Sequence, residues 1–403
     1  MFAAIAATMA VVLAWACVSG AMTRWSVTGP VAMIVVGCIV GLSTEHWLME
    51  SVNTKAAQRV AEFLLALFLF NDATEIRRRI SRNTGVTRML VAFALSLPFA
   101  MLVGRFVLQQ DSWPLLLLVA CVVMPTDMVP AQSVLTDSRI TRRVRDTLNI
   151  ESGLNDGLVA PLFLFALAAI QRTADSDQAL GALGHAVPAV FKSMLIGVPI
   201  GAAAGYALTV ATTRGWTDAH TVRCGILAIP ALTYALAVLI DGNGFVAAFL
   251  AGIAYRAGHG DIPGRPLELT EGLAEFSGLA LWFTVGTIAV VVPWLSWRVV
   301  VFGLLALTLL RIVPVLLALF GSRFSWRERI VLSCLGPRGV ASIVFALLAV
   351  NGLSGSGDIE LVVGVTLVVV TGSVVLHGLG APLLAERYGH RIGRRAAVQL
   401  PPE

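Results

Sequence analysis

The stretch LNIESGLNDGLVAP, residues 148–161, places two carboxylates, Glu151 and Asp156, at the start of a long apolar run. A charged side chain inside a bilayer costs about 2.5–3.5 kcal/mol on insertion scales, so each carboxylate needs a functional or structural reason. On a helix, Glu151 and Asn155 share one face, while Ser152 and Asp156 share the neighbouring face. The strip therefore presents hydroxyl, amide and carboxylate oxygens, which are suitable ligands for a small cation. The same carboxylates can also carry a proton.

The composition around this stretch is that of a membrane protein. Hydrophobic residues make up 57% of the 403 residues, charged residues make up 13%, and the mean hydropathy is +0.83, whereas soluble domains carry roughly 25% charged residues. About thirteen apolar stretches approach the ~20 residues needed to cross the hydrocarbon layer. They lie at approximately 3–22, 28–44, 58–73, 86–108, 113–135, 147–171, 187–212, 221–240, 243–257, 271–292, 297–320, 328–350 and 360–385. We therefore predict an all-α polytopic membrane protein.

The distribution of charge predicts the orientation of these spans. With the N-terminus outside, most of the 29 lysine and arginine residues fall in loops on the inner side, as the positive-inside bias requires. The net charge of +5 is then a consequence of topology and does not indicate a nucleic-acid partner. We expect a multi-pass protein of the cell (inner or plasma) membrane, with residues 1–385 forming one membrane domain and residues 386–403 a short cytoplasmic tail. The first apolar stretch follows no basic segment, so we expect a retained helix rather than a cleaved signal.

Two predicted spans are interrupted near their middle by proline, glycine and charge. The fifth contains VVMPTDMVP at residues 122–130, and the twelfth contains LGPRGVAS at residues 335–342. Proline leaves backbone carbonyls without helical partners, and in lipid such irregular backbone survives only where it is buried in protein or lines a cavity. In the predicted topology the two spans run in opposite directions. This arrangement is typical of inverted-repeat transporters, whose binding site lies at the crossing of the interrupted helices.

Charged residues inside the spans are the candidate site residues, because intramembrane charges usually mark transport pathways. We expect Asp127 and Asp156 to be functional carboxylates. Glu151 is expected to pair with Arg338, since a buried arginine needs a partner. Arg311, in the eleventh span, has no assigned counter-ion.

Three further residues are left open by the sequence. Asp72 and Glu75 close the third span at the inner interface, where a solvated role and a role in a cation funnel fit equally well. His377 lies in the last span. It can sense pH, but a core histidine with satisfied hydrogen bonds is the favoured interpretation.

Together these motifs resemble the bacterial NhaP and animal NHE type of monovalent cation/proton antiporters along nearly the full chain. The segments that carry the resemblance are Thr126 with Asp127, ESGLNDG at 151–157, GNGFVAAFLAG at 242–252 and GPRGV at 336–340. The resemblance implies an NhaA/NhaP-like fold of about 13 transmembrane helices, with inverted repeats and two crossed broken helices. It also implies a homodimer, in which a transporting bundle moves against a dimerisation scaffold. The bundle corresponds approximately to residues 86–171 and 297–385.

The resemblance further implies roles for individual residues. Asp156 would bind cation and proton in competition, and the monovalent cation would be coordinated by Asp156, Asp127, Ser152 and Thr126. The supporting polar network would consist of Glu151, Asn155 and Arg338. Members with asparagine before the aspartate are generally electroneutral, so we expect one Na⁺ (or Li⁺ or K⁺) per H⁺ and no cofactor beyond these ions. One departure is Met128, which follows Asp127 where many members have proline.

Three other functions fit parts of the sequence. A passive cation channel is one, but no filter-like segment is present. A proton-coupled carrier of another solute is the second, and an organic anion would require a cationic site, whereas this site is rich in carboxylates. An intramembrane aspartyl protease is the third, because GSGD occurs at residues 355–358 and two aspartates can share a proton. That segment lies in a Gly/Ser-rich loop and the chain has no Tyr-Asp dipeptide, so we expect a transporter and no enzyme.

Overall fold

The computed structural model describes residues 2–24, 27–43, 55–76, 84–131, 134–135, 137, 139–171, 178–259, 265–291 and 296–380. These residues are almost entirely helical, and none of them lies in a strand. The predicted tail, 386–403, lies outside the described residues. The all-helical fold predicted from the sequence is therefore confirmed.

The long helices carry the transmembrane part of the fold. They are α1 (Phe2–Arg24), α2 (Gly29–Ser43), α4 (Lys55–Ile76), α5 (Thr84–Val107), α6 (Trp113–Val123), α8 (Arg142–Gln171), α9 (Gln178–Thr213), α10 (Ala219–Leu239), α11 (Gly244–Gly258), α12 (Glu268–Val291), α13 (Trp297–Leu307), α14 (Leu309–Ala318), α15 (Trp326–Cys334), α16 (Val340–Gly352) and α17 (Ser356–Ser373). Within the described chain, eight spans are long and apolar enough to cross a membrane, and four shorter apolar helices accompany them. Each of the thirteen predicted ranges contains a helix.

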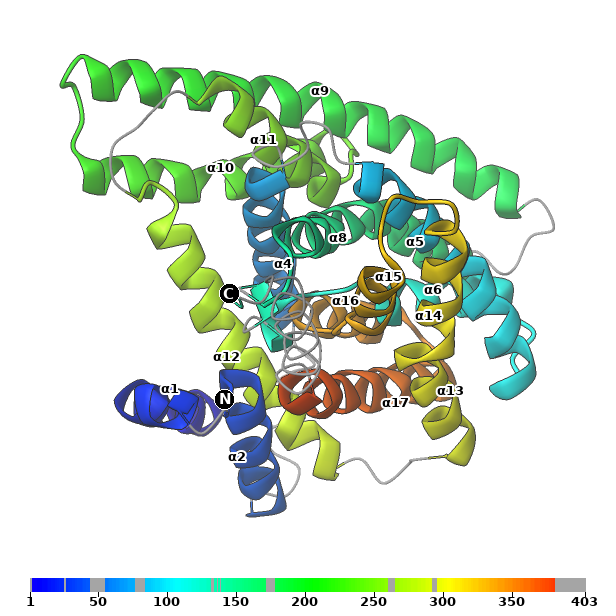
Figure 1. Cartoon of the computed structure of the whole chain (residues 1–403). Helices are drawn as coiled ribbons and strands as arrows, with labels where there is room; N and C mark the ends of the chain where they lie inside the picture. Colours follow the sequence, from blue (N-terminus) through cyan, green and yellow to red (C-terminus); the bar gives the residue numbers. More distant parts are fainter. Residues whose placement is uncertain are drawn as a thin grey trace, which may run out of the picture.

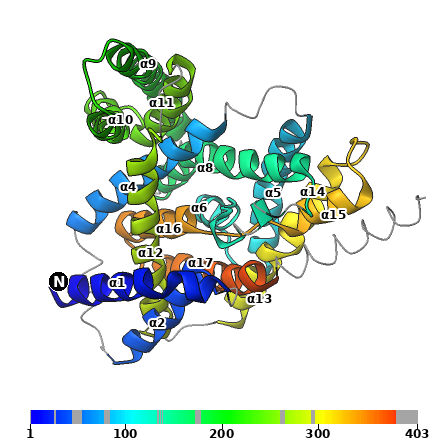
Figure 2. The same ribbon diagram turned by 60° about the vertical axis from the view of Figure 1, so that its left-hand side comes forward.

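The helices form three groups, which are visible in both views (Figures 1 and 2). Helices α9, α10 and α11 pack together at one end of the molecule, and α1 and α2 lie at another, against α12. The third group contains α5, α6, α8 and α13 to α17, which pack on one another. Helix α4 contacts both the first and the third group. The 148–161 stretch lies within α8 and therefore inside the third group.

Three helices are interrupted within the membrane part. In the fifth predicted span, α6 ends at Val123 and a short 3₁₀ turn, η1 (Val129–Ala131), follows. In the twelfth, α15 and α16 are separated by the non-helical residues 335–339. The eleventh span is also interrupted, because the backbone of Thr308 leaves the helical region and separates α13 from α14. The sequence did not predict this third interruption.

The outer surface of the molecule suits a bilayer. Large apolar side chains such as Phe106, Phe191 and Phe320 are more than half exposed. The described tryptophans at helix ends, Trp113, Trp216, Trp297 and Trp326, are also exposed, as an interfacial aromatic belt should be.

Close helix packing between α9 and α11 depends on glycines at four-residue spacing. A Cβ atom on Gly197, Gly201 or Gly205 would collide with a backbone carbonyl oxygen of α11. Without a hydrophobic driving force between helices in lipid, such backbone contacts supply much of the association energy. These glycines therefore fix α9 on α11.

We expect Gly201→Ala to lower the stability of the protein by about 1–3 kcal/mol, because the added methyl group must displace the α11 backbone. The measurement is thermal unfolding of the purified protein in detergent. Gly184→Ala is the matched control, since nothing lies within 4 Å of a Cβ at Gly184 on the same helix. Equal melting temperatures for both variants would contradict this account of the packing.

Candidate functional site

The two interrupted helices touch directly at Asp127. The backbone N–H of Asp127 donates to the carbonyl oxygen of Pro337 at 2.8 Å. Its carboxylate accepts two backbone N–H groups, from Val129 at 2.9 Å and from Val340 at 2.8 Å. Val340 is the first residue of α16, so the negative charge of Asp127 lies at the positive end of that helix. A side chain on Gly339 would collide with this carboxylate.

Arg338 occupies the complementary position. Its guanidinium donates to the carbonyl oxygen of Val123, the last residue of α6, at 2.6 Å. It also donates to the carbonyls of Gly336 at 2.6 Å and Ala306 at 3.4 Å. The side chain is fully buried. A positive charge therefore lies at the negative end of α6, and each interrupted span supplies the charged cap of the other.

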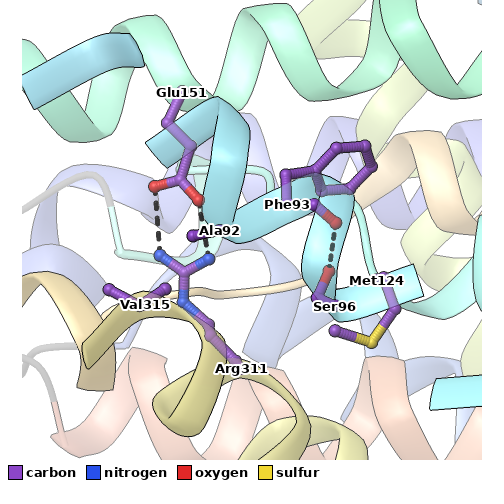
Figure 3. Close-up of a pocket in the computed structure, with 7 residues that line it drawn as sticks. All are labelled: Ala92, Phe93, Ser96, Met124, Glu151, Arg311 and Val315. Carbon is purple, nitrogen blue, oxygen red and sulfur yellow. Dashed lines mark hydrogen bonds and ion pairs between the residues drawn. The ribbon is translucent and has the colours of Figure 1, made fainter. Parts of the chain in front are cut away.

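The predicted ion pair between Glu151 and Arg338 is wrong. Glu151 instead pairs with Arg311 through two hydrogen bonds, at 2.7 and 3.1 Å (Figure 3). Both side chains are buried, and Arg311 also donates to the carbonyls of Leu332 and Leu335. Because the interruption at Thr308 precedes it by three residues, Arg311 lies in the first turn of α14.

A small cavity adjoins this ion pair. It measures about 10 Å³, close to the volume that one water molecule requires. Figure 3 shows its lining, which is Ala92, Phe93, Ser96, Met124, Glu151, Arg311 and Val315. The cavity is too small for any larger ligand.

The remaining predicted site residues come together between α8 and the interrupted fifth span. The hydroxyl of Ser152 donates to the carbonyl oxygen of Thr126 at 2.9 Å, and the amide of Asn155 donates to the Thr126 hydroxyl at 3.1 Å. Asp156 is buried, with 4% of its surface exposed, and its Oδ1 atom has no hydrogen-bond partner among the described residues. An unpaired buried carboxylate oxygen is costly, so Asp156 is the group in this cluster that still needs a cation or a proton.

Asp72 of α4 is a fourth carboxylate near the site, although the sequence did not assign it there. Its backbone and Cβ atoms lie 3.2–3.3 Å from the position of a Cβ on Gly153, one helical turn before Asp156. Its charge interacts with those of Asp127 and Asp156. The signal available in the sequence was a carboxylate at the end of an apolar run, which did not distinguish a solvated residue from a site residue. Within the described chain, no three His, Cys, Asp or Glu side chains are close enough to hold a metal ion together.

Comparison with known families gives a match over most of the chain. The sequence model described as "Sodium/hydrogen exchanger, transmembrane" matches residues 8–387. The K(+)/H(+) antiporter NhaP of Alkalimonas amylolytica is 28% identical over 275 residues, which are 65% of this chain and 45% of that protein. A Na(+)/H(+) antiporter of Schizosaccharomyces pombe is 27% identical over 261 residues, 58% of this chain and 53% of that one. The chain thus spans about half the length of these curated relatives.

A solved structure has the same fold. The sodium proton antiporter MjNhaP1 from Methanocaldococcus jannaschii superposes with a TM-score of 0.76, covering 94% of this chain and 99% of that one at 17% identity. The similarity confirms the predicted antiporter fold.

We expect Glu151→Gln and Arg311→Gln each to lower stability by about 3–5 kcal/mol, because each leaves an unpaired buried charge. The double variant should lose much less than the sum, and thermal unfolding in detergent measures the difference. As a control, Arg59→Gln breaks a pair with Glu62 in which the arginine is 74% exposed, and should leave the stability nearly unchanged, because solvent screens such a pair. Additive losses in the Glu151/Arg311 pair would contradict the assigned pairing.

Proposed function

The chain belongs to the sodium/hydrogen exchanger family, a family of transporters, and we propose that it exchanges a monovalent cation for a proton, with both competing for Asp156. The observation that carries this proposal is the buried Asp156 carboxylate, whose Oδ1 atom has no partner. Such a group cannot stay charged and unpaired at low dielectric. It is neutralised either by a bound cation or by a proton, and the two states exclude one another.

The surrounding charges support this role for Asp156. Arg311 is bonded to Glu151, and Arg338 is bonded to three backbone carbonyls. Neither arginine forms a salt bridge with Asp156 in the described chain, so a permanent counter-ion does not fill the site. Asp127 already accepts two backbone N–H groups, which favours a role in holding the crossing together over a role as the alternating carboxylate.

For the cation we propose a site built from hard oxygen ligands. Asp156 would provide the charge, and the hydroxyls of Ser152 on α8 and of Thr126 in the interrupted fifth span would add neutral ligands. Asp127, the next residue after Thr126, would complete the set, while Asn155, Glu151 and Arg338 would hold the geometry. Oxygen ligands of this kind suit sodium, lithium or potassium, and the named relatives include both Na⁺/H⁺ and K⁺/H⁺ antiporters. The exchange needs no cofactor.

We propose a stoichiometry of one cation per proton. Of the carboxylates at the crossing, Glu151 is neutralised by Arg311, and the charge of Asp127 is stabilised by two backbone N–H groups. Asp156 is then the group that alternates, and it carries one positive charge in each direction. Exchange of one charge for one charge is electroneutral.

Access to the site would alternate by movement of one bundle against the rest of the protein. In this proposal residues 86–171 and 297–385 form the moving bundle, and the other helices form a scaffold through which two chains dimerise. Gly157, next to Asp156, packs on the ring of Phe249 in α11, and Gly153 packs on Asp72 in α4. At the site, the face of α8 that meets the other helices therefore carries two glycines and allows close packing. The N-terminus would lie outside and the C-terminus in the cytoplasm of a cell membrane.

We expect Asp156→Asn to abolish exchange, because asparagine binds neither the proton nor the charge of the cation. The measurement is collapse of a preset pH gradient in proteoliposomes after addition of sodium, lithium or potassium salts, with the membrane potential clamped at different values. Wild-type collapse should not depend on that potential. Glu360→Gln, which removes an exposed carboxylate, is the control and should behave as wild type.

Each other outcome has a definite meaning. Equal collapse with Asp156→Asn would remove this carboxylate from the mechanism. Absence of collapse by the wild type with all three cations would favour a proton-coupled carrier of another solute. Cation flux without proton flux would favour a passive channel.

We expect Asp72→Asn to raise the cation concentration for half-maximal exchange by about fivefold, the effect of losing about 1 kcal/mol of charge attraction near the site. The maximal rate should change less than the half-saturating concentration. The same proteoliposome assay, run over a range of cation concentrations, separates the two quantities. Asp111→Asn is the control, because that carboxylate is 88% exposed. An unchanged half-saturating concentration would place Asp72 outside the cation pathway.

A further inference from the structure

The interruption in the twelfth span exposes backbone carbonyls that no helix satisfies, and the structure provides a donor for each of several. Arg311 donates to Leu332 and Leu335, Arg338 donates to Gly336, and the N–H of Asp127 donates to Pro337. The carbonyl oxygen of Cys334, the last residue of α15, faces Nε2 of His377 at 3.2 Å. His377 therefore belongs to the same group of donors as the charged residues of the crossing.

His377 lies in a single π-helical segment, η2 (Val374–Leu379), that continues α17. The side chain is 3% exposed. Its Nδ1 atom is 3.3 Å from the hydroxyl and 3.1 Å from the carbonyl oxygen of Ser373. The Ser373 hydroxyl in turn accepts the backbone N–H of Arg338 at 2.6 Å. Segments of this kind within α-helices are frequently found at functional sites.

The two neutral tautomers of His377 differ in how many of these contacts they can use. A proton on Nδ1 would serve the Ser373 carbonyl, but Nε2 would then face the Cys334 carbonyl without a proton, and both groups would be acceptors. With the proton on Nε2, His377 donates to Cys334, and Nδ1 accepts the proton of the Ser373 hydroxyl, which itself accepts from the N–H of Arg338. Only this second tautomer gives both ring nitrogens a hydrogen bond.

We propose that His377 and Ser373 are positioning residues for the exchange reaction, which clamp the two ends of the interruption at Cys334 and Arg338. Neither side chain touches the cation site. They act through the backbone of residues 335–339, which holds the guanidinium of Arg338 on α6 and presents the N–H of Val340 to Asp127. This role rests on the proposed exchange function.

The neighbourhood of the imidazole agrees with a neutral ring. The charged groups whose fields act on it are Arg338 and Arg311, both cations. The segment η2 also packs on η1 and α2, and no carboxylate is a partner of the ring in the described contacts. A histidine that only filled space would not need the arrangement of one donor and one acceptor on opposite sides.

Two conservative variants separate the arms of the clamp. His377→Gln keeps a donor at the position of Nε2 and loses the acceptor for Ser373. His377→Asn keeps an acceptor at the position of Nδ1 and loses the donor for Cys334. We expect each to lower the exchange rate per folded molecule by about five- to tenfold, the effect of one lost buried hydrogen bond, and His377→Ala to lower it further. Val375→Ala, at a side chain of the same segment that is 61% exposed, should match wild type.

A double-variant comparison tests the connection through Ser373. Ser373→Ala removes the hydrogen bonds to both Arg338 and His377, whereas His377→Gln removes only the second of these. The combination should therefore be no slower than Ser373→Ala alone. Ser373→Ala combined with His377→Asn should be slower than either, because both arms are then lost. Multiplied effects in the first pair, or rates within twofold of wild type for all His377 variants, would overturn the proposal.

A spectroscopic readout keeps this test independent of transport. Nitrogen resonances of [¹⁵N]histidine-labelled protein in liposomes distinguish the two neutral tautomers, and the signals absent from His377→Gln identify those of His377. We expect a protonated Nε2 and an unprotonated Nδ1, with the Nδ1 signal shifted by Ser373→Ala. The opposite tautomer would overturn the clamp even if exchange were confirmed. The expected tautomer without any exchange by the wild type would instead contradict the proposed function alone.

Discussion

The physical constraint on which this structure depends is that backbone groups released by a broken helix must find partners without water. In lipid an unsatisfied N–H or carbonyl costs several kcal/mol. At the crossing, charged side chains supply these partners. The carboxylate of Asp127 accepts the backbone N–H groups of Val129 and Val340, and the guanidinium of Arg338 donates to the carbonyl oxygen of Val123 at the end of α6. Arg311 donates to the carbonyl oxygen of Leu332 in the last turn of α15, and Nε2 of His377 lies 3.2 Å from the carbonyl oxygen of Cys334. The charges in the membrane are thus first of all part of the fold.

This use of charge leaves Asp156 in a special position. Both buried arginines have fixed partners, as have Glu151 and Asp127. Asp156 lies in the middle of α8, where the backbone is regular and has no need of its charge. A carboxylate that the fold does not use can change its protonation without disturbing the helices around it. In the proposed function, this separation of the structural charges from the titrating one would allow the site to bind either ion.

Much of the fold was predictable because hydrophobic length and proline position are local properties. A helix lies within each of the thirteen predicted ranges, and both predicted interruptions are present. The grouping of Thr126 with Ser152 and Asn155 was implied by the family resemblance. The partner of Glu151 was not predictable in this way. In the sequence both Arg311 and Arg338 lie inside predicted spans. The break at Thr308, which the sequence did not predict, places Arg311 in the first turn of α14, where it pairs with Glu151. The hydrogen bonds of Arg338 to backbone carbonyls depend on how separate helices cross, and so does the position of Asp72 beside Gly153. A local sequence pattern does not contain this information.

The reciprocal capping of the two interrupted spans also bears on the order in which the protein is made. Asp127 and Val340 are 213 residues apart, and Arg338 and Val123 are 215 apart. A ribosome therefore delivers the fifth span to the membrane long before its partner has been translated. During that interval Asp127 lacks the N–H of Val340, and the end of α6 lacks the guanidinium of Arg338. Both must remain near water or beside an insertion factor. The crossing of the two interrupted spans is thus completed among the last steps of the protein's biogenesis, after most of the other helices are already in the bilayer.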